Sequence, residues 1–356
     1  MEITTIGLDL AKHVFQVHGV AADGSVVLKR RLRRGQVHAF FAGLRPCLVG
    51  MEACATAHFW ARQLLELGHQ VRLMPAQYVK AYLRRGKNDA ADAAAICEAV
   101  TRPSMRFVPV KGETQQSALM LHRVRDLLVR QRTQLINAIR GHLAEFGIVE
   151  AQGPWNVPRL LAGMEDARLP ELARGLVRLL AGHLDELELR IAEIDAQIMA
   201  WHKADPVSRR LATIPGIGSL AATAIAATVP DPAVFRSGRE FAAWLGLVPR
   251  QNSTGGKTRL GRTSRQGDAY IRRLLVIGAQ SALWCSKATK ANPWIQALLA
   301  KRPRLVVAIR AILLANATAT TSRGRLASSA WIQGSALVAL EQSRADCAPM
   351  TSRRRM

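Results

Sequence analysis

The chain has 356 residues, and its 50 Lys and Arg residues against 26 Asp and Glu residues give a formal net charge of +24 at pH 7. With 49% hydrophobic and 21% charged residues, the composition is that of a globular protein of two or three domains and excludes a mainly disordered chain. The five cysteines include no C-x-x-C pair, which argues against a zinc ribbon or a disulfide scaffold and, with no apolar run fit to span a bilayer, predicts a cytoplasmic location without membrane contact.

Strand and helix patterns alternate over residues 1–110. Three strands with short turns come first and predict an antiparallel meander: Ile3–Leu8, His13–Val20 and Val26–Leu32. Two helices and two strands then alternate: Gln36–Leu44, Cys47–Met51, Ala57–Leu67 and Gln70–Met74. An alanine-rich helix follows. This β-β-β-α-β-α-β-α order is that of the RNase H-like nuclease fold, so an α/β N-terminal domain of this type is expected.

Four carboxylates stand at the ends of these elements. Asp9 closes the first strand, Glu52 follows the fourth strand, and Asp89 and Asp92 begin the alanine-rich helix. In an RNase H-like sheet the first and fourth strands are neighbours, so Asp9 and Glu52 converge, and the i, i+3 spacing puts both aspartates on one helix face. Such a cluster needs divalent cations, and its hard oxygen ligands suit Mg²⁺ or Mn²⁺. In the alternative interpretation the carboxylates bind no metal: Asp89 is a helix N-cap, Asp92 compensates the helix dipole and Glu52 is a solvated carboxylate.

Residues 111–205 carry two stripes of residues at heptad spacing. The first stripe is Leu121, Val124, Leu128, Gln131, Leu135, Ala138 and His142. The second is Leu180, Leu184, Leu187, Ile191, Ile194, Ile198 and Trp201. They predict a helical coiled-coil region, either antiparallel within one chain or between chains, and we expect a homo-oligomer, a dimer or tetramer. A plain helical bundle is the alternative.

The positive charge is concentrated at the C-terminal end. Residues 1–110 carry a net charge of +7, residues 111–205 carry −1 and residues 206–356 carry +18. The net charge of +18 over residues 206–356 exceeds what solubility requires. The phosphate backbone of a nucleic acid is therefore the expected partner. We expect a mainly helical domain over residues 206–345 and a basic tail over residues 346–356.

Two motifs in the third region suit contact with phosphates. Ile214–Ser219, with Gly216 and Gly218, resembles a helix-hairpin-helix element, in which glycines let backbone N–H groups approach a phosphate. After a helix expected at Phe235–Leu247, the segment Gln251–Lys257 forms a polar glycine loop that no expected strand precedes. Basic residues surround this loop: Arg250, Lys257, Arg259, Arg262, Arg265, Arg272 and Arg273.

The loop carries two neighbouring hydroxyls, Ser253 and Thr254. A hydroxyl among guanidinium groups suits phosphoryl transfer to a side chain, because the fixed positive charge stabilises the transition state. The loop lacks the spacing of an ATPase P-loop. A solvated turn that contacts phosphates without chemistry is the alternative.

The chain resembles the DEDD-type insertion-sequence transposases of bacteria. The blocks that carry the resemblance are Gly7–Asp9, Gly50–Cys54, Lys87–Ala93, Ile214–Gly218, Gly246–Arg250 and Asn252–Lys257. The resemblance spans roughly residues 3–315 and implies a RuvC-like domain, a coiled coil and a C-terminal transposase domain. It also implies Asp9, Glu52, Asp89 and Asp92 as the magnesium-binding tetrad.

The same resemblance implies Ser253 as a recombination nucleophile that forms a covalent DNA intermediate, with Thr254 as the alternative. It implies donor and target DNA as substrates and a structured bridge RNA as guide. Two other functions stay open: a junction-resolving nuclease that uses the tetrad alone, and a non-catalytic nucleic-acid-binding protein.

Overall fold

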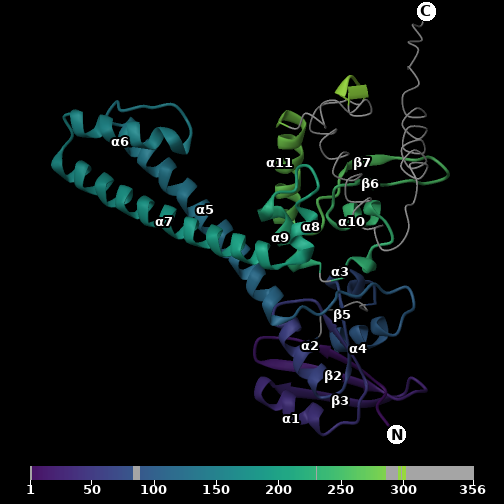
Figure 1. Cartoon of the computed structure of the whole chain (residues 1–356). Helices are drawn as coiled ribbons and strands as arrows, with labels where there is room; N and C mark the ends of the chain where they lie inside the picture. The colour runs from purple at the N-terminus through teal and green to yellow at the C-terminus, as the bar shows by residue number, and fades with distance from the viewer. Residues whose placement is uncertain (1, 83–88, 230, 286–295, 298, 302–356) are drawn as a thin grey trace, which may run out of the picture. The chain divides into compact units, whose positions relative to one another are not determined.

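The computed structural model describes residues 2–82, 89–229, 231–285, 296–297 and 299–301 (Figure 1). The chain divides into two compact units, residues 1–198 with 226–231, and residues 199–225 with 232–356, which we describe separately. The expected basic tail and the end of the expected C-terminal domain lie outside the described residues. No helix among the described residues is long and apolar enough to cross a membrane.

The first unit contains a five-stranded sheet in the order β3-β2-β1-β4-β5. Its strands are β1 (Thr5–Asp9), β2 (Val14–Val20), β3 (Val26–Arg33), β4 (Leu48–Glu52) and β5 (Gln70–Met74). Strands β1, β2 and β3 are antiparallel neighbours, while β4 and β5 run parallel to β1. The predicted meander and the predicted contact between the first and fourth strands are therefore confirmed.

Helices cover both faces of the sheet. The short α1 (Val37–Ala42) and α2 (Ala57–Glu66) contribute to the main core, with Phe41 and Trp60 packing among strand residues such as Leu8 and Met51. On the other face, α4 (Asp89–Val100) packs against β1, β2 and β4. A short α3 (Ala76–Val79) and a 3-10 turn (Lys80–Tyr82) connect the sheet to this side of the unit.

Two glycines let α4 lie close to the sheet. Gly7 and Gly50 are partners in the β1–β4 register, so they stand side by side. A Cβ atom at Gly7 would lie 2.1 Å from the Ala93 carbonyl oxygen, and one at Gly50 would lie 2.7 Å from Cβ of Val100. Because any side chain would push the helix away, these glycines fix the height of α4 above the strands.

Two long helices follow, α5 (Glu113–Ala144) and α7 (Glu171–Ala204), with α6 (Val157–Asp166) and a short 3-10 turn (Pro154–Asn156) between them. Ile139 of α5, Leu160 of α6 and Leu184 of α7 share one apolar cluster. Nearer the sheet, Arg125 of α5 pairs with Asp195 of α7. The two long helices thus form an antiparallel hairpin within the chain.

The stripe of residues predicted to pack is buried on α7, as expected. On α5 the buried stripe is shifted by one residue from the predicted stripe. On α7, Leu184, Leu187 and Ile191 are buried as expected. On α5 the buried residues are Ala118, His122, Ile136, Ile139 and Leu143, while the expected stripe is exposed or half-buried. α5 has apolar residues on adjacent positions, so heptad spacing alone does not choose between two faces about 100° apart.

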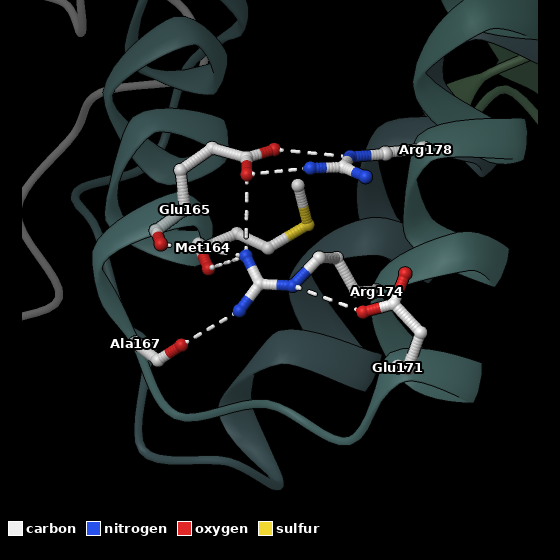
Figure 2. A network of polar contacts seen from close by, with 6 residues as sticks. All are labelled: Met164, Glu165, Ala167, Glu171, Arg174 and Arg178. Atoms are coloured by element: carbon white, nitrogen blue, oxygen red, sulfur yellow. Dashed lines mark hydrogen bonds and ion pairs between the residues drawn. The ribbon is translucent and has the colours of Figure 1, made fainter.

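Polar contacts join α6 to α7 at the far end of the hairpin, as Figure 2 shows. Arg174 of α7 donates to the carbonyl oxygens of Met164 and Ala167 at the end of α6, at 3.0 and 2.9 Å. Glu165 accepts from Arg174 and Arg178, the latter at 2.7 Å. Because the donated bonds satisfy carbonyls that end α6, this network holds the short helix across the hairpin.

The second unit is mainly helical and contains one small hairpin. Its helices are α8 (Pro206–Leu211), α9 (Ser219–Thr228), α10 (Gly238–Trp244) and α11 (Ala269–Cys285), with a 3-10 turn (Pro232–Val234). Strands β6 (Pro249–Gln251) and β7 (Leu260–Thr263) pair antiparallel. The prediction that no strand precedes the serine loop was therefore wrong, because three exposed residues carry too little pattern to reveal a strand.

Candidate functional site

Asp9 and Glu52 end adjacent parallel strands. Leu8 and Met51 are register partners, and each carboxylate is the next residue and the last of its strand. Side chains alternate along a strand, so Asp9 shares a face with Gly7, and Glu52 shares it with Gly50. This is the face that α4 covers, which means that both carboxylates point to the side of the sheet where Asp92 lies in the first turn of α4.

The charges of these carboxylates act on one another. Burial, followed by the nearby Asp92 carboxylate, raises the pKa of Glu52, while the Lys80 ammonium opposes the shift. Burial and then the charges of Glu52 and Asp9 raise the pKa of the Cys54 thiol. Negative charge therefore accumulates at the carboxyl ends of β1 and β4, and a cation would relieve it.

A hard divalent cation fits this donor set by its chemistry. Asp9, Glu52 and Asp92 offer only carboxylate oxygens, and the Cys54 thiol is a neighbour of Glu52 and Asp9. The geometry is not closed: among the residues that the structure describes, no three His, Cys, Asp or Glu side chains lie close enough together to hold one ion. Asp89 begins α4, but its side chain lies outside the description.

The sequence interpretation missed two polar neighbours of this site. Lys80, in the 3-10 turn after α3, is close enough to Glu52 to affect its pKa. Gln16 of β2 is the register partner of Asp9. The strand alternation of β2 was the available signal for Gln16, whereas Lys80 depends on a tertiary turn that carries no pattern.

Ser253 lies two residues after the end of β6, in the second unit. Its Oγ accepts two hydrogen bonds, from Nε2 of Gln251 at 3.0 Å and from the backbone N–H of Arg259 at 3.3 Å. All three residues are exposed, so the hydroxyl is held in place and open to a large ligand. Gln251 was not singled out from the sequence, because its contact depends on hairpin geometry.

Thr254 occupies the turn rather than the strand. Its carbonyl accepts the Lys257 N–H at 3.1 Å, with Gly255 and Gly256 between them at φ +55° and +74°. Two consecutive residues in the left-handed region make a tight hairpin turn that other residues adopt only under strain. The two glycines thus shape the tip of the hairpin, and Ser253 is the hydroxyl that the strands position.

The basic residues around the hairpin divide into exposed and engaged groups. Lys257, Arg259, Arg262 and Arg265 are exposed. Arg250 donates weakly to the Ser264 carbonyl at 3.4 Å, and Arg273 stacks over Tyr270 with 5.4 Å to the ring centroid. Arg272 donates to the carbonyls of Leu245 and Gln266 at 2.7 and 2.8 Å. Arg272 therefore ties α11 to the loop before it, which is a structural role that the sequence interpretation did not anticipate.

The glycines of the P-G-I-G turn differ from each other. Gly216 has φ +88°, and a Cβ there would lie 2.7 Å from the Gly278 carbonyl oxygen of α11. Its lack of a side chain therefore serves close packing onto α11, and the expected phosphate contact of its backbone N–H stays a prediction. A Cβ at Gly218, just before α9, would meet nothing within 4 Å. The space around Gly218 leaves room for the phosphate contact predicted there.

Comparisons with known proteins match each of the two units to a transposase family model. The family model described as "Transposase IS116/IS110/IS902 family" matches residues 208–295, and a transposase model of the DEDD type named for IS110 matches residues 6–148. The chain is similar to a "Probable family 20 transposase" of Pseudomonas aeruginosa, with 50% identity over 87% of this chain and 93% of the relative.

More distant relatives carry the same kind of name. The transposase for insertion sequence element IS1328 of Yersinia enterocolitica is 43% identical over 77% of this chain and 82% of its own length. The transposase for insertion sequence element IS1111A of Coxiella burnetii is 38% identical over 85% and 84%. With identity this high over most of its length, the chain belongs to the IS116/IS110/IS902 family of transposases.

Proposed function

We propose that this transposase cleaves and rejoins DNA as a site-specific recombinase, with Ser253 as the nucleophile and Asp9, Glu52, Asp89 and Asp92 as a magnesium-binding tetrad. The observation that carries the proposal is the meeting of Asp9 and Glu52 at the ends of in-register strands under α4, with Asp92 close enough to raise the pKa of Glu52. A structural role does not account for like charges gathered on a half-buried face, because each raises the cost of the others.

The tetrad would hold Mg²⁺ or Mn²⁺, which supplies positive charge to the attacking and leaving oxygens of a phosphodiester. The chain itself contributes the position of the ligands. The β1 and β4 backbones fix Asp9 and Glu52, and the glycine contacts fix the helix that carries Asp89 and Asp92. Lys80 beside Glu52 offsets part of the negative charge.

Ser253 is suited to attack on phosphorus. The bond that forms joins Oγ to phosphorus, the bond that breaks joins phosphorus to one deoxyribose oxygen, the serine proton passes to water and the leaving oxygen takes up a proton. Once deprotonated, Oγ has three lone pairs, and the N–H donors of Gln251 and Arg259 occupy two of them. These donors stabilise the oxyanion and leave one lone pair for the attack.

The proposed partners are donor DNA, target DNA and a structured bridge RNA, with the protein acting as a homo-oligomer. The net charge of +18 over residues 206–356 supports a nucleic-acid partner, and the exposed residues Lys257, Arg259, Arg262 and Arg265 would hold phosphates beside Ser253. The role of RNA as guide depends on the family resemblance.

Strand exchange with purified protein tests the proposal. The reaction would contain a circular donor, a target duplex, Mg²⁺ and RNA transcribed from the DNA that flanks the gene. Ser253→Ala is expected to lose strand exchange by about 10³-fold or more, whereas Thr254→Ala, the matched neighbour, retains it. Cleavage that survives in Ser253→Ala would instead indicate a nuclease that uses the tetrad alone. If the unaltered protein gives no product but binds both nucleic acids, the non-catalytic alternative gains.

A further inference from the structure

We propose that a groove between the β2–β3 edge of the sheet and α4 binds the backbone of the DNA strand that leads to the carboxylates, with Lys29 and Arg31 as phosphate contacts. This inference rests on the proposed function, because it assigns a path to the strand on which the carboxylates act. It concerns a part of the first unit that is separate from the expected basic residues of the second unit.

The strand register puts these basic residues in line with the acidic site. Asp9 pairs with Gln16 of β2, and Gln16 pairs with Arg31 of β3. Directly opposed residues on neighbouring strands share a face of the sheet. Asp9, Gln16 and Arg31 therefore form one row on the face that α4 covers.

A second row runs beside the first. Gly7 pairs with His18, and His18 pairs with Lys29. At Gly7 the row is covered by Ala93 of α4, which leaves His18 and Lys29 beyond the helix. The two rows together extend from the carboxylates to the edge strand, with Lys29 and Arg31 at the outer end.

A cavity of about 420 Å³ occupies this place. Its floor is formed by β2 and β3, including Gln16, His18, Lys29 and Arg31, and its wall by Ala90, Ala91, Ala93 and Ala94 of α4. Asp92 lies between Ala91 and Ala93 in the sequence. The helix thus lines the groove with methyl groups, and Asp92 of the same helix lies close enough to Glu52 to raise its pKa.

The charge of the groove is positive and uncompensated by neighbouring carboxylates. Lys29 and Arg31 are exposed, and within the described part of the chain no carboxylate lies within ion-pair distance of either. Burial, and then the charge of Lys29, lower the pKa of His18, which favours its neutral form. Arg31 and Asp9 lie in the same row with β2 between them, which suits a strand that has one phosphate at Arg31 and a later phosphate at the carboxylates.

Arg30 provides a matched control within the same strand. Arg30 is one of the residues that line the cavity, but its guanidinium carbon lies 5.4 Å from the ring centroid of Phe40. Its register partner is Val17, a core residue, so the charge of Arg30 lies on the opposite face of the sheet. A change of Arg30 alters the net charge as much as a change of Lys29 or Arg31 but leaves the groove side intact.

Salt-dependent binding by the full-length protein tests the inference, with a fluorescein-labelled single-stranded DNA of about 15 nucleotides as probe. Each phosphate contact to a single strand contributes about 0.7 to the slope of log K against log salt, so Lys29→Ala with Arg31→Ala is expected to lower the slope by about 1.4. Arg30→Ala is expected to leave it unchanged. An equal slope in the double variant, or an equal decrease in Arg30→Ala, would overturn the assignment.

Acetylation of lysines in the unaltered protein gives a second readout that needs no variant. Lys29 is expected to be protected by the DNA probe, while Lys12, exposed in the turn before β2, is modified as before. An RNA of the same sequence that protects Lys29 equally well or better would show an RNA surface and overturn the assignment to DNA. Neither readout uses Ser253, so loss of strand exchange in Ser253→Ala stands whether or not the groove binds DNA.

Discussion

The two candidate sites are built in opposite ways. The carboxylates of the first unit stand at the ends of hydrogen-bonded strands, under a helix whose approach two glycines determine. Ser253 stands on a short, exposed hairpin, held by one side-chain amide and one backbone N–H. One site depends on packing of the core and the other on local hydrogen bonds.

This difference follows from the chemistry proposed for each site. Carboxylates that share a cation must be held together against their repulsion, which requires a rigid frame. A nucleophile that attacks a phosphate within a large nucleic acid must be reachable, which requires exposure. We therefore expect packing changes to impair the first site and leave the second intact, and hydrogen-bond changes to do the reverse.

Removing one carboxylate charge has the largest expected effect. Asp9→Asn keeps the size of the side chain but weakens the binding of a divalent cation, so Mg²⁺-dependent strand cleavage is expected to fall by about 10³-fold. DNA binding, measured by fluorescence anisotropy, is expected to change little. Asp23→Asn, which removes the same charge from the β2–β3 turn, is the control. Cleavage by Asp9→Asn at the normal rate would exclude Asp9 from the tetrad.

Filling the space beneath α4 comes next. Gly7→Ala places a Cβ 2.1 Å from the Ala93 carbonyl oxygen and is expected to lower the free energy of unfolding by about 2 to 3 kcal/mol and displace α4. Gly35→Ala, where a Cβ would meet nothing within 4 Å, is expected to have little effect. Urea unfolding measures both variants. Equal stability of Gly7→Ala and the unaltered protein would contradict the close packing.

The next prediction concerns one hydrogen bond of the hairpin, from Gln251 to Ser253. Gln251→Ala removes one of the two donors to Ser253 Oγ and is expected to slow formation of the covalent DNA adduct by about tenfold. The deficit is expected to be the same at every pH well below the pKa of a serine hydroxyl, because the ionised fraction then rises with pH by the same factor in both proteins. Asn252→Ala is the control, since its backbone N–H bonds to Arg259 whatever its side chain. An equal deficit in Asn252→Ala would indicate general damage to the hairpin.

The smallest effect concerns the joint between α2 and α5. Burial, and then the charges of Lys111, Arg62 and Arg123, lower the pKa of His58 to about 4, and Nδ1 of His58 accepts the Lys111 N–H at 3.2 Å. A histidine in the unfolded chain titrates near pH 6.5, so between about pH 6.5 and 4 the unfolded state binds more protons and stability falls as the pH falls.

His58→Gln is expected to remove this part of the acid sensitivity, by about 1 kcal/mol or less because the group is half exposed. Thermal unfolding at pH 7.5 and pH 5.0 measures it, and His38→Gln, at an exposed position, is the control. If the shift in Tm between the two pH values is the same in both variants, His58 does not contribute.

The sequence predicts the sheet well because its signals are local. Alternation in residues 14–20 and the apolar run before Asp9 show where strands lie, and the order of elements specifies that β1 adjoins β4. The convergence of Asp9 and Glu52 follows from that order. The side of α5 that packs did not follow, since adjacent apolar positions at 135–136 and 138–139 fit a heptad equally well.

Tertiary contacts account for the remaining differences. The sequence did not predict that Gly216 packs closely against Gly278, which lies about sixty residues later along the chain. Arg272 suggested DNA binding, yet it donates to two carbonyls of its own unit. Tertiary contacts alone place three further residues at the proposed sites, namely Gln251, Lys80 and Lys29. No local sequence pattern predicts these contacts.

Identification of the residue that becomes attached to DNA tests the central claim most directly. The protein would react with donor DNA, target DNA, RNA and Mg²⁺, and the trapped complex would be digested with nuclease and protease and sequenced by mass spectrometry. We expect a nucleotide on Ser253, absent in Asp9→Asn. A nucleotide on Thr254 or another residue, or strand exchange without any attached nucleotide, would contradict the account.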